Sequence, residues 1–205
     1  MPVPKTCYPK SENDLKEISD TVGFPCIIKP AIGYDFLKTF KSKVFLCNDN
    51  EELRTNYIRS LEIMKPDGIM VQENISGSSE YQYSVGLFVD KDRIYNCLVA
   101  RRTRQNPPDF GTGTTYAEAV HIPELIGYSE KILYEVQFSG ICEVEFKYDN
   151  RDGLYKFLEV NARIWRWHVL TEDVGILLLL IMYMCCTSGY PIDKKDNLEC
   201  VGAMI

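Results

Sequence analysis

Hydrophobic residues follow two different spacings along this chain, and together they predict both helices and strands. Apolar positions three or four residues apart are typical of a helix that buries one face, whereas strict alternation is typical of a half-buried strand. The segments with helical spacing are residues 11–23, 48–64, 123–136 and 169–187. The segments predicted as strands are residues 26–29, 44–47, 69–72, 80–89, 93–101, 141–148 and 154–161. Two pairs of these strands form predicted hairpins, so the sequence predicts an α+β fold with antiparallel sheet.

Two stretches between these elements are predicted to be irregular. Residues 33–43 are polar and rich in lysine, and residues 104–113 contain two prolines and two glycines. Prolines and glycines at this density interrupt regular structure. A third segment, residues 71–80, leaves an apolar strand and becomes a polar turn. Such a change is typical both of a hinge between lobes and of an ordinary loop.

The composition and the charge exclude several classes of protein. The 205 residues are 45% hydrophobic and 25% charged, near the average of globular chains, which excludes a disordered or fibrous protein. The 23 basic and 29 acidic residues give a net charge of −6, which argues against a protein that binds the phosphates of nucleic acid. The most apolar run, residues 176–186, is shorter than the ~20 residues of a membrane-spanning helix, so no membrane partner is expected.

The eight cysteines and the N-terminal residues indicate the compartment. The cysteines form no C-x-x-C pair and show no metal-like spacing, and several lie within apolar strand-like runs. Buried free thiols in a reducing cytosol explain this pattern better than a disulfide scaffold does. The first five residues are polar and proline-rich, unlike a secretory signal. We therefore expect a cytoplasmic protein.

The predicted hairpin of residues 141–161 gathers acidic side chains. Glu143 and Glu145 lie two apart on one strand, so both leave the same face. Glu159 and Asn161 do the same on the partner strand. Like charges opposite each other on a sheet repel, which suggests a cation between them, and oxygen ligands without histidine or cysteine favour magnesium. The alternative is a solvated sheet face on which Glu143 pairs with a neighbouring lysine.

A lysine at the end of a buried strand suggests an anion site. Lys29 closes the apolar run of residues 26–29, where a charged side chain is poorly placed unless a cleft or an anion receives it. Further lysines follow in residues 33–43, a stretch able to fold over the same anion. Neither a G-x-x-x-x-G-K-[ST] nor a G-x-G-x-x-G phosphate motif is present. The alternative is an ordinary charge at the edge of a sheet.

Four segments in order resemble the ATP-grasp superfamily. The usual order in that superfamily is a strand ending in lysine, a lysine-bearing loop, a strand with a Gln-Glu step and a later glutamate, and a hairpin ending in Glu-x-Asn-x-Arg. The corresponding segments here are Ile27-Ile28-Lys29-Pro30, residues 33–43, Met70-Val71-Gln72-Glu73 with Glu80, and Glu159-Val160-Asn161-Ala162-Arg163. Each motif is weak alone, but the four in this order make a strong signal.

The resemblance covers nearly the whole chain and implies a single ATP-grasp domain over residues 1–205. Its two α/β lobes, with antiparallel sheets, would grip a nucleotide cleft. Residues 1–73 would form the smaller lobe, with Lys29 and the hinge strand, and residues 74–205 the larger lobe, with the magnesium-site hairpin. Members of the superfamily carry an N-terminal subdomain before this region, so a chain truncated at its N-terminus is an open alternative.

For the nucleotide, the resemblance implies contacts from both predicted lobes. Lys29 would contact the phosphates, with Lys43 as a second cation. The backbone of Gln72, Glu73 and Asn74 would meet the adenine edge, with the Glu73 side chain close by, and Glu80 would hold the ribose hydroxyls. The tryptophan-rich residues 165–168 would either wall off the pocket or pack in the core.

For the chemistry, the resemblance implies a metal and a phosphoryl-stabilising arginine. Glu145, Glu159 and Asn161 would ligate magnesium, although the hairpin pattern alone does not separate Glu143 from Glu145. Arg163 and Lys29 would be catalytic, Arg163 by stabilising the transferring phosphoryl group. Three arginines suit a substrate carboxylate, and a solvated strand end explains them equally well. They are Arg101, Arg102 and Arg104.

The activity that the resemblance implies is that of an ATP- and magnesium-dependent ligase. A substrate carboxylate would attack the γ-phosphoryl group of ATP to give an acyl phosphate, and an amine would then displace phosphate. The expected partners are a small-molecule carboxylate and amine of amino-acid-like kind, and a homodimer is left open. One alternative is a non-catalytic ATP-binding fragment or subunit of a larger ATP-grasp enzyme. Another is a different metal-dependent enzyme, such as a hydrolase built on Glu143, Glu145 and Glu159.

Overall fold

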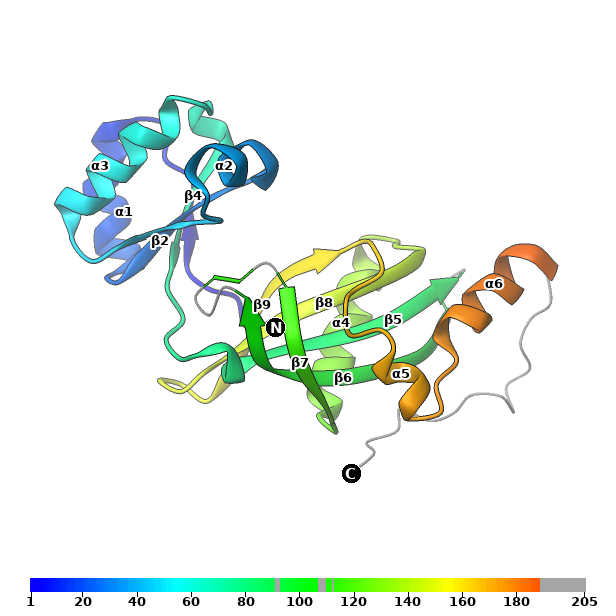
Figure 1. The fold of residues 1–205 in the computed structure, drawn as a ribbon. Helices are drawn as coiled ribbons and strands as arrows, with labels where there is room; N and C mark the ends of the chain where they lie inside the picture. Colours follow the sequence, from blue (N-terminus) through cyan, green and yellow to red (C-terminus); the bar gives the residue numbers. More distant parts are fainter. Residues whose placement is uncertain (91–92, 107–109, 112, 189–205) are drawn as a thin grey trace. The chain divides into compact units, whose positions relative to one another are not determined.

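The computed structural model describes residues 1–90, 93–106, 110–111 and 113–188, and the chain divides into two compact units (Figure 1). The small unit is Val3–Ser76, and the large unit comprises Met1–Pro2 and Gly77–Ile205. Each unit has its own sheet and its own hydrophobic core. Both sheets are antiparallel and carry helices, which confirms the predicted α+β fold.

The small unit is built on a four-stranded antiparallel sheet in the order β1-β4-β2-β3. Its strands are β1 (Thr6–Cys7), β2 (Cys26–Pro30), β3 (Phe45–Cys47) and β4 (Ile69–Glu73). Helices α1 (Leu15–Val22) and α3 (Asn50–Leu61) bury their apolar faces in its core, and short 3-10 turns span Glu12–Asp14 and Pro66–Gly68. Gly23 ends α1 with a φ of 77°, as predicted, and the Asp49 side chain caps the start of α3, which ends at Leu61, three residues before the predicted end.

A third helix of the small unit, α2 (Gly33–Phe40), lies where the sequence analysis expected an irregular stretch. Phe36 is fully buried, and its ring centroid lies 4.9 Å from that of Phe40 and 4.8 Å from that of Phe45. Phe36 and Phe40 are four residues apart, so a helix brings both rings to one face against β3. The prediction was wrong because it weighed the exposed lysines more heavily than the aromatic residues between them.

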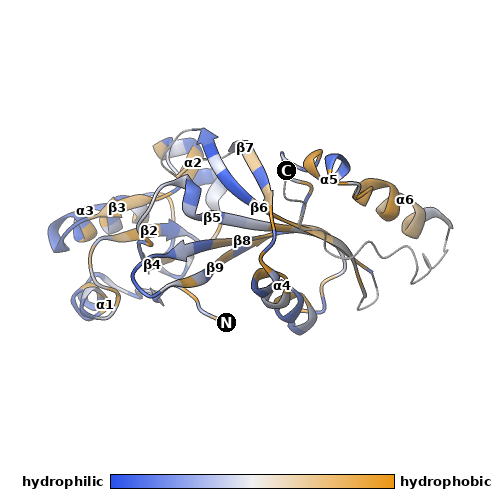
Figure 2. Ribbon diagram, turned by 90° about the horizontal axis from the view of Figure 1, so that it is seen from below, coloured by the Kyte–Doolittle hydropathy of each residue, from blue (hydrophilic) through white to orange (hydrophobic). Residues whose placement is uncertain are grey.

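The large unit is built on a five-stranded sheet in the order β7-β6-β5-β8-β9. Its strands are β5 (Gln82–Asp90), β6 (Arg93–Asn106), β7 (Gly113–Val120), β8 (Gly140–Asp149) and β9 (Leu154–Asn161), and a 3-10 turn spans Ser79–Tyr81. Helix α4 (Pro123–Glu135) covers one face, and α5 (Leu170–Asp173) and α6 (Leu178–Ser188) lie on the other (Figure 2). Successive residues of the central strands β5 and β6 therefore point into two different hydrophobic clusters.

Three details of the large unit differ from the prediction. Strand β6 continues to Asn106, so Arg104 lies in a strand and not in the predicted loop. Strand β7 was missed, because it is a sheet edge of mostly small and polar residues. The predicted C-terminal helix is two helices, since Gly175 between them has a φ of 82°.

Figure 2 shows α6 as hydrophobic along most of its length, but no helix in the described ranges is long and apolar enough to cross a membrane.

Most of the described cysteines are free thiols. These are Cys7, Cys26, Cys47, Cys142, Cys185 and Cys186. Cys26, Cys47 and Cys142 are fully buried, as their positions in apolar strands predict. Cys97 is disulfide-bonded, so the expectation of free thiols is wrong at that position.

Candidate functional site

Glu145 and Glu159 face each other across the β8–β9 hairpin. The antiparallel register pairs Glu145 with Glu159 and Glu143 with Asn161. Nδ2 of Asn161 donates a hydrogen bond to Oε1 of Glu145 at 3.0 Å. Both strands alternate in hydrophobicity, and the turn between them includes Gly153 with a φ of 73°, so this hairpin forms from local sequence. It gathers carboxylate and amide oxygens on one face of the sheet.

A buried arginine reaches the same glutamate from β6. The Arg102 side chain is only 9% exposed, and its Nη2 lies 3.2 Å from Oε1 of Glu145 and 4.0 Å from Oε1 of Glu143. Nη1 of Arg102 donates to Oε1 of Gln82 at 3.2 Å. A guanidinium group therefore lies beside both neighbouring glutamates, whereas the magnesium expected from the sequence stays a prediction.

Glu143 has surroundings different from those of Glu145. Its side chain is buried, and Nε1 of Trp167 donates to its Oε1 at 2.8 Å. Burial raises the pKa of Glu143, and the nearby Glu145 carboxylate raises it further. Glu145 contacts Asn161 whereas Glu143 contacts Trp167, so their contacts distinguish two residues that the hairpin pattern left equivalent.

Two tryptophans pack on this face of the sheet. The rings of Trp165 and Trp167 lie 5.1 Å apart, and both belong to the core that α6 covers. Gly86 of β5, which pairs with Glu143, gives Trp165 room, because a Cβ atom on Gly86 would lie 2.1 Å from Cζ2 of the indole. Of the two expectations for residues 165–168, packing in the core applies to both tryptophans, and Trp167 also orients Glu143.

The donor set on the hairpin suits a hard cation. Within the part of the chain that the structure describes, no three histidine, cysteine, aspartate or glutamate side chains are grouped to hold a metal. Two carboxylates and one amide are present instead, from Glu145, Glu159 and Asn161. Magnesium commonly takes one or two protein carboxylates and completes its shell with water and substrate phosphates. The residues therefore fit magnesium that arrives with a phosphate-bearing ligand.

Arg163 extends this cluster toward solvent. It is exposed just after β9, and its Nη2 donates to Oδ1 of Asn161 at 3.3 Å. Its Nη1 donates to the backbone oxygen of Ile164 at 3.1 Å. Because Asn161 in turn donates to Glu145, the three side chains form one hydrogen-bonded chain. An exposed guanidinium at the end of this chain is suited to an anionic group bound beside the carboxylates.

The three arginines predicted to bind a substrate are not brought together. Arg101 and Arg102 are successive residues of a strand and point to opposite faces. Nη2 of Arg101 lies 2.6 Å from Oε2 of Glu118 on β7. Arg104 is exposed and follows a register shift between β6 and β7. The predicted group therefore separates into three environments, of which only that of Arg102 includes the hairpin carboxylates.

The predicted phosphate and ribose residues lie at the surface or near it. In the small unit, Lys29 is half-buried in β2, and Lys43 is exposed just before β3. In the large unit, Glu80 is exposed in the 3-10 turn before β5, and its backbone nitrogen donates to Oγ of Ser78 at 3.4 Å. The charged groups of Lys43 and Glu80 are thus accessible to a ligand.

The predicted adenine strand is well connected within the small unit. Nε2 of Gln72 donates to Oγ1 of Thr6 at 2.8 Å, and Oε1 of the buried Glu73 accepts from the backbone nitrogen of Lys5 at 3.0 Å. The backbone nitrogen of Asn74 donates to the Pro25 oxygen at 3.1 Å. The side chains of Gln72 and Glu73 therefore hold the N-terminal strand against β4.

Two contacts of the site were missed by the sequence analysis, those of Arg102 with Glu145 and of Trp167 with Glu143. Strand β5 separates β6 from β8, and no local spacing reveals which strands become neighbours. The sequence did contain a signal that Arg102 is buried. It follows Leu98 and Ala100 at alternate positions and so continues a buried face of β6.

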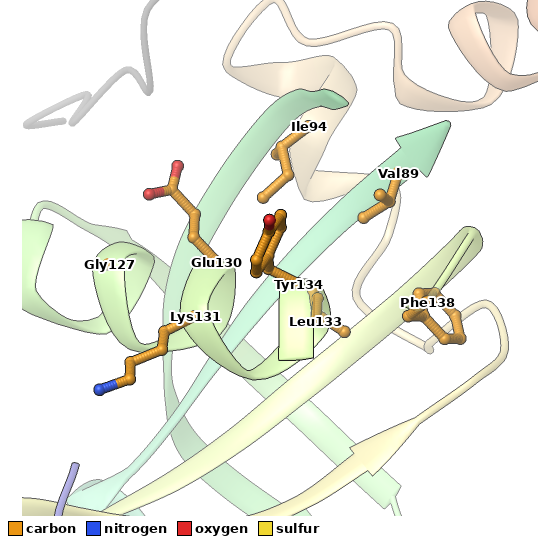
Figure 3. A pocket seen from close by; sticks show the side chains of 8 residues that line it. All are labelled: Val89, Ile94, Gly127, Glu130, Lys131, Leu133, Tyr134 and Phe138. Carbon is orange, nitrogen blue, oxygen red and sulfur yellow. The ribbon is translucent and has the colours of Figure 1, made fainter. Parts of the chain in front are cut away.

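A pocket of about 590 Å³ lies elsewhere in the large unit, beside α4 (Figure 3). Figure 3 shows the ring of Tyr134 facing the strands, while the charged ends of Glu130 and Lys131 point in different directions. The lining residues are Val89, Ile94, Gly127, Glu130, Lys131, Leu133, Tyr134 and Phe138. Val89 and Leu133 belong to the core under α4, on the opposite face of the sheet from Glu145. This pocket is therefore separate from the carboxylate cluster.

Known protein sequences match most of this chain. The sequence model of one family, the carbamoyl-phosphate synthase L chain, ATP binding domain, matches residues 2–195. The chain is 26% identical over 192 residues to the N-terminal section of the carbamoyl phosphate synthase large chain of Methanopyrus kandleri, covering 90% of this chain and 30% of that one. It is 27% identical over 176 residues to D-aspartate ligase of Enterococcus faecium, covering 80% of this chain and 41% of that one.

Solved structures share the fold. A biotin carboxylase from Campylobacter jejuni superposes with a TM-score of 0.77 at 17% identity, covering 98% of this chain and 45% of that one. An L-amino acid ligase from Bacillus licheniformis superposes with a TM-score of 0.63 at 19% identity, covering 89% of this chain and 43% of that one. The chain thus spans less than half the length of each of these four proteins.

Proposed function

Because the chain belongs to the family of the carbamoyl-phosphate synthase L chain ATP-binding domain and has the ATP-grasp fold, we propose that it is an ATP-dependent carboxylate–amine ligase. In the first step, an oxygen of the substrate carboxylate attacks the γ-phosphorus of ATP, and ADP leaves, giving an acyl phosphate. In the second step, the amine nitrogen attacks the acyl carbon, phosphate leaves, and the nitrogen loses a proton to give an amide. The protein contributes mainly positioning and charge neutralisation.

The observation that carries this proposal is the pairing of Glu145 with Glu159 beside Asn161. These residues would hold the magnesium of the nucleotide, and the bound ion would neutralise phosphate charge. Arg163, which donates to Asn161, would place its guanidinium next to the transferring phosphoryl group. Its exposure supports this role, because the group that it contacts arrives from solution.

The other nucleotide contacts are proposed on the resemblance to the superfamily. Lys29 and Lys43 would contact the phosphates, with Lys29 also catalytic, and Glu80 would contact the ribose. The strand end at Gln72, Glu73 and Asn74 would meet the adenine edge. The exposure of Lys43 and Glu80 supports their assignments.

We propose amino-acid-like carboxylates and amines as the substrate class. The names of two similar proteins, a D-aspartate ligase and an L-amino acid ligase, support this class. Arg101 and Arg104 of β6 both have exposed surface, and they are candidates for a substrate carboxylate. The net charge of −6 supports small-molecule partners over nucleic acid, and the free thiols support a cytoplasmic location.

A second candidate function is ATP binding without turnover, as part of a larger enzyme. The observation that favours it is the length of the curated relatives, since the chain spans 30%, 41% and 18% of three of them. In that case an N-terminal subdomain, or a second copy of the chain, would complete the substrate site.

Release of ADP from magnesium-ATP, measured with amino acids added singly and in pairs, tests these functions. We expect one carboxylate–amine pair to stimulate release, and we expect Glu159→Gln to abolish it together with magnesium-dependent ATP binding, because a carboxylate ligand is lost. Glu135→Gln, at an exposed position at the end of α4, is the matched control and should behave as wild type. Binding of magnesium-ATP without stimulated release would support the second candidate, whereas no binding at all would contradict both.

A further inference from the structure

We propose that Arg102 is a positioning residue that orients Glu145 toward the nucleotide-bound metal, and that it does not bind the substrate. This inference rests on the proposed function. It starts from an unusual position for a charge, because the Arg102 side chain is only 9% exposed. A guanidinium that leaves water must find anionic or polar partners within the protein, or the fold is strongly destabilised. Its partners therefore indicate its role.

Arg102 and Asn161 converge on one oxygen of Glu145. Nη2 of Arg102 lies 3.2 Å from Oε1 of Glu145, and Nδ2 of Asn161 donates to the same oxygen at 3.0 Å. Arg102 approaches from β6 and Asn161 from β9, on either side of β8 in the sheet. The ion pair with Arg102 and the hydrogen bond from Asn161 both hold Oε1 and restrict the rotation of the carboxylate. This arrangement would leave the other oxygen, Oε2, for the metal.

The strand between Arg102 and Glu145 is shaped for this contact. On β5, the residue paired with Glu145 is Ser84, which is buried. A side chain this small lets the long arginine side chain cross β5 and reach β8. Gln82, two residues earlier on the same face, accepts from Nη1 at 3.2 Å and holds the second arm of the guanidinium. The planar fork thus contacts β5 and β8 at once, which a lysine ammonium would not reproduce.

The same contacts argue against a substrate role for Arg102. Both terminal nitrogens already have protein partners, Gln82 and Glu145. The third nitrogen, Nε, is buried, and the whole side chain is only 9% exposed, so a substrate carboxylate would have to displace a glutamate to reach the group. Partners of this kind, which orient a metal ligand without touching the metal, commonly change metal affinity about 10–100-fold when they are removed.

The test measures how ATP binding depends on magnesium. Calorimetric titration of ATP at a series of magnesium concentrations gives the concentration needed for half-maximal binding. For Arg102→Gln we expect this concentration to rise about 10–100-fold, with ATP affinity restored at saturating magnesium. For Arg102→Lys, which keeps the charge but loses the fork, we expect a smaller rise. Arg54→Gln, which breaks an exposed ion pair with Glu12 in the small unit, is the control and should match wild type.

The outcomes separate this inference from the proposed function. If wild type shows no magnesium-dependent ATP binding, the proposed function fails. If wild type binds and both Arg102 variants keep its magnesium dependence, only the positioning role is overturned. If Arg102→Gln does not fold, Arg102→Lys gives the same comparison, because it leaves no buried carboxylate without a cation. In addition, Arg102→Lys should have no effect on magnesium dependence when Glu145→Gln is already present, and a full additive effect would contradict action through Glu145.

Discussion

The buried carboxylate of Asp149 stabilises the hairpin that carries the candidate site. It accepts hydrogen bonds from the backbone nitrogen, Nε and Nη2 of Arg151, and Nζ of Lys156 lies 3.0 Å from its Oδ2. These hydrogen bonds, those from Arg151 foremost, hold the pKa of Asp149 well below its ordinary value. The turn that brings Glu145 opposite Glu159 therefore depends on a carboxylate that must stay ionised.

Replacing Asp149→Asn should reduce the free energy of unfolding by about 2–4 kcal/mol near neutral pH, because the largely buried Lys156 loses the buried one of its two carboxylate partners. A group whose pKa is lowered by folding stabilises the protein fully above its unfolded pKa of about 3.9. That stabilisation is lost as the pH falls through the lower folded pKa, so the difference between wild type and variant should shrink below about pH 4. Urea unfolding of wild type and variant across this pH range measures the difference in their free energies of unfolding.

Asp152→Asn is the matched control for this prediction. Asp152 also lies 3.0 Å from Nζ of Lys156, but its side chain is 39% exposed, so its loss should cost less than about 1 kcal/mol. Equal losses for the two variants, or a difference for Asp149→Asn that does not depend on pH, would show that the buried ion pair is not what stabilises the turn.

At the scale of elements, the sequence predicts what local spacing determines and misses what strand order determines. The β8–β9 hairpin and its carboxylates were predicted because two alternating strands flank an adjacent turn. Helix α2 was missed because charged residues obscured the spacing of Phe36 and Phe40. The contact of Arg102 with Glu145 requires the order β6-β5-β8, which depends on packing across the sheet. For the same reason, the sequence analysis expected magnesium beside Glu143 and Glu145 and did not predict the Arg102 guanidinium that lies there.

The register of β2 against β3 predicts a specific cross-link in the small unit. Cys26 and Cys47 are directly opposite each other, and both are buried free thiols. Cα atoms of antiparallel partners lie about 4.5–5.5 Å apart, within the range of a disulfide. Strand β3 is a three-residue edge strand, so its local opening exposes the pair. Hydrogen peroxide would oxidise the two thiols to a disulfide and be reduced to two molecules of water.

After slow peroxide oxidation of the folded protein, peptide mass spectrometry should find Cys26 joined to Cys47. With Cys47→Ser, Cys26 should remain reduced, since it has lost the thiol opposite it. Cys142 is the internal control, because it pairs with Leu87 and burial raises its pKa to about 12. A cross-link from Cys26 to any cysteine other than Cys47 would contradict the register.

At the scale of the whole molecule, the two units have separate hydrophobic cores. The small-unit core joins α1 and α3 to the four-stranded sheet, and the large unit has a cluster on each face of its own sheet. Both tryptophans of the chain, Trp165 and Trp167, lie in the large unit. Tryptophan fluorescence therefore reports the large unit alone, whereas far-ultraviolet circular dichroism reports the helices and strands of both.

These two probes should separate the unfolding of the units. Leu53→Ala, at a fully buried position of α3, should lower the midpoint of an unfolding transition followed by circular dichroism. The midpoint of the transition followed by fluorescence should stay unchanged. Leu133→Ala, at an equally buried position of α4, should lower the fluorescence midpoint. Each truncation should cost about 2–5 kcal/mol in its own core. Since a cooperative two-state protein gives coincident transitions with every probe, midpoints that move together in both variants would mean that the two cores unfold as one.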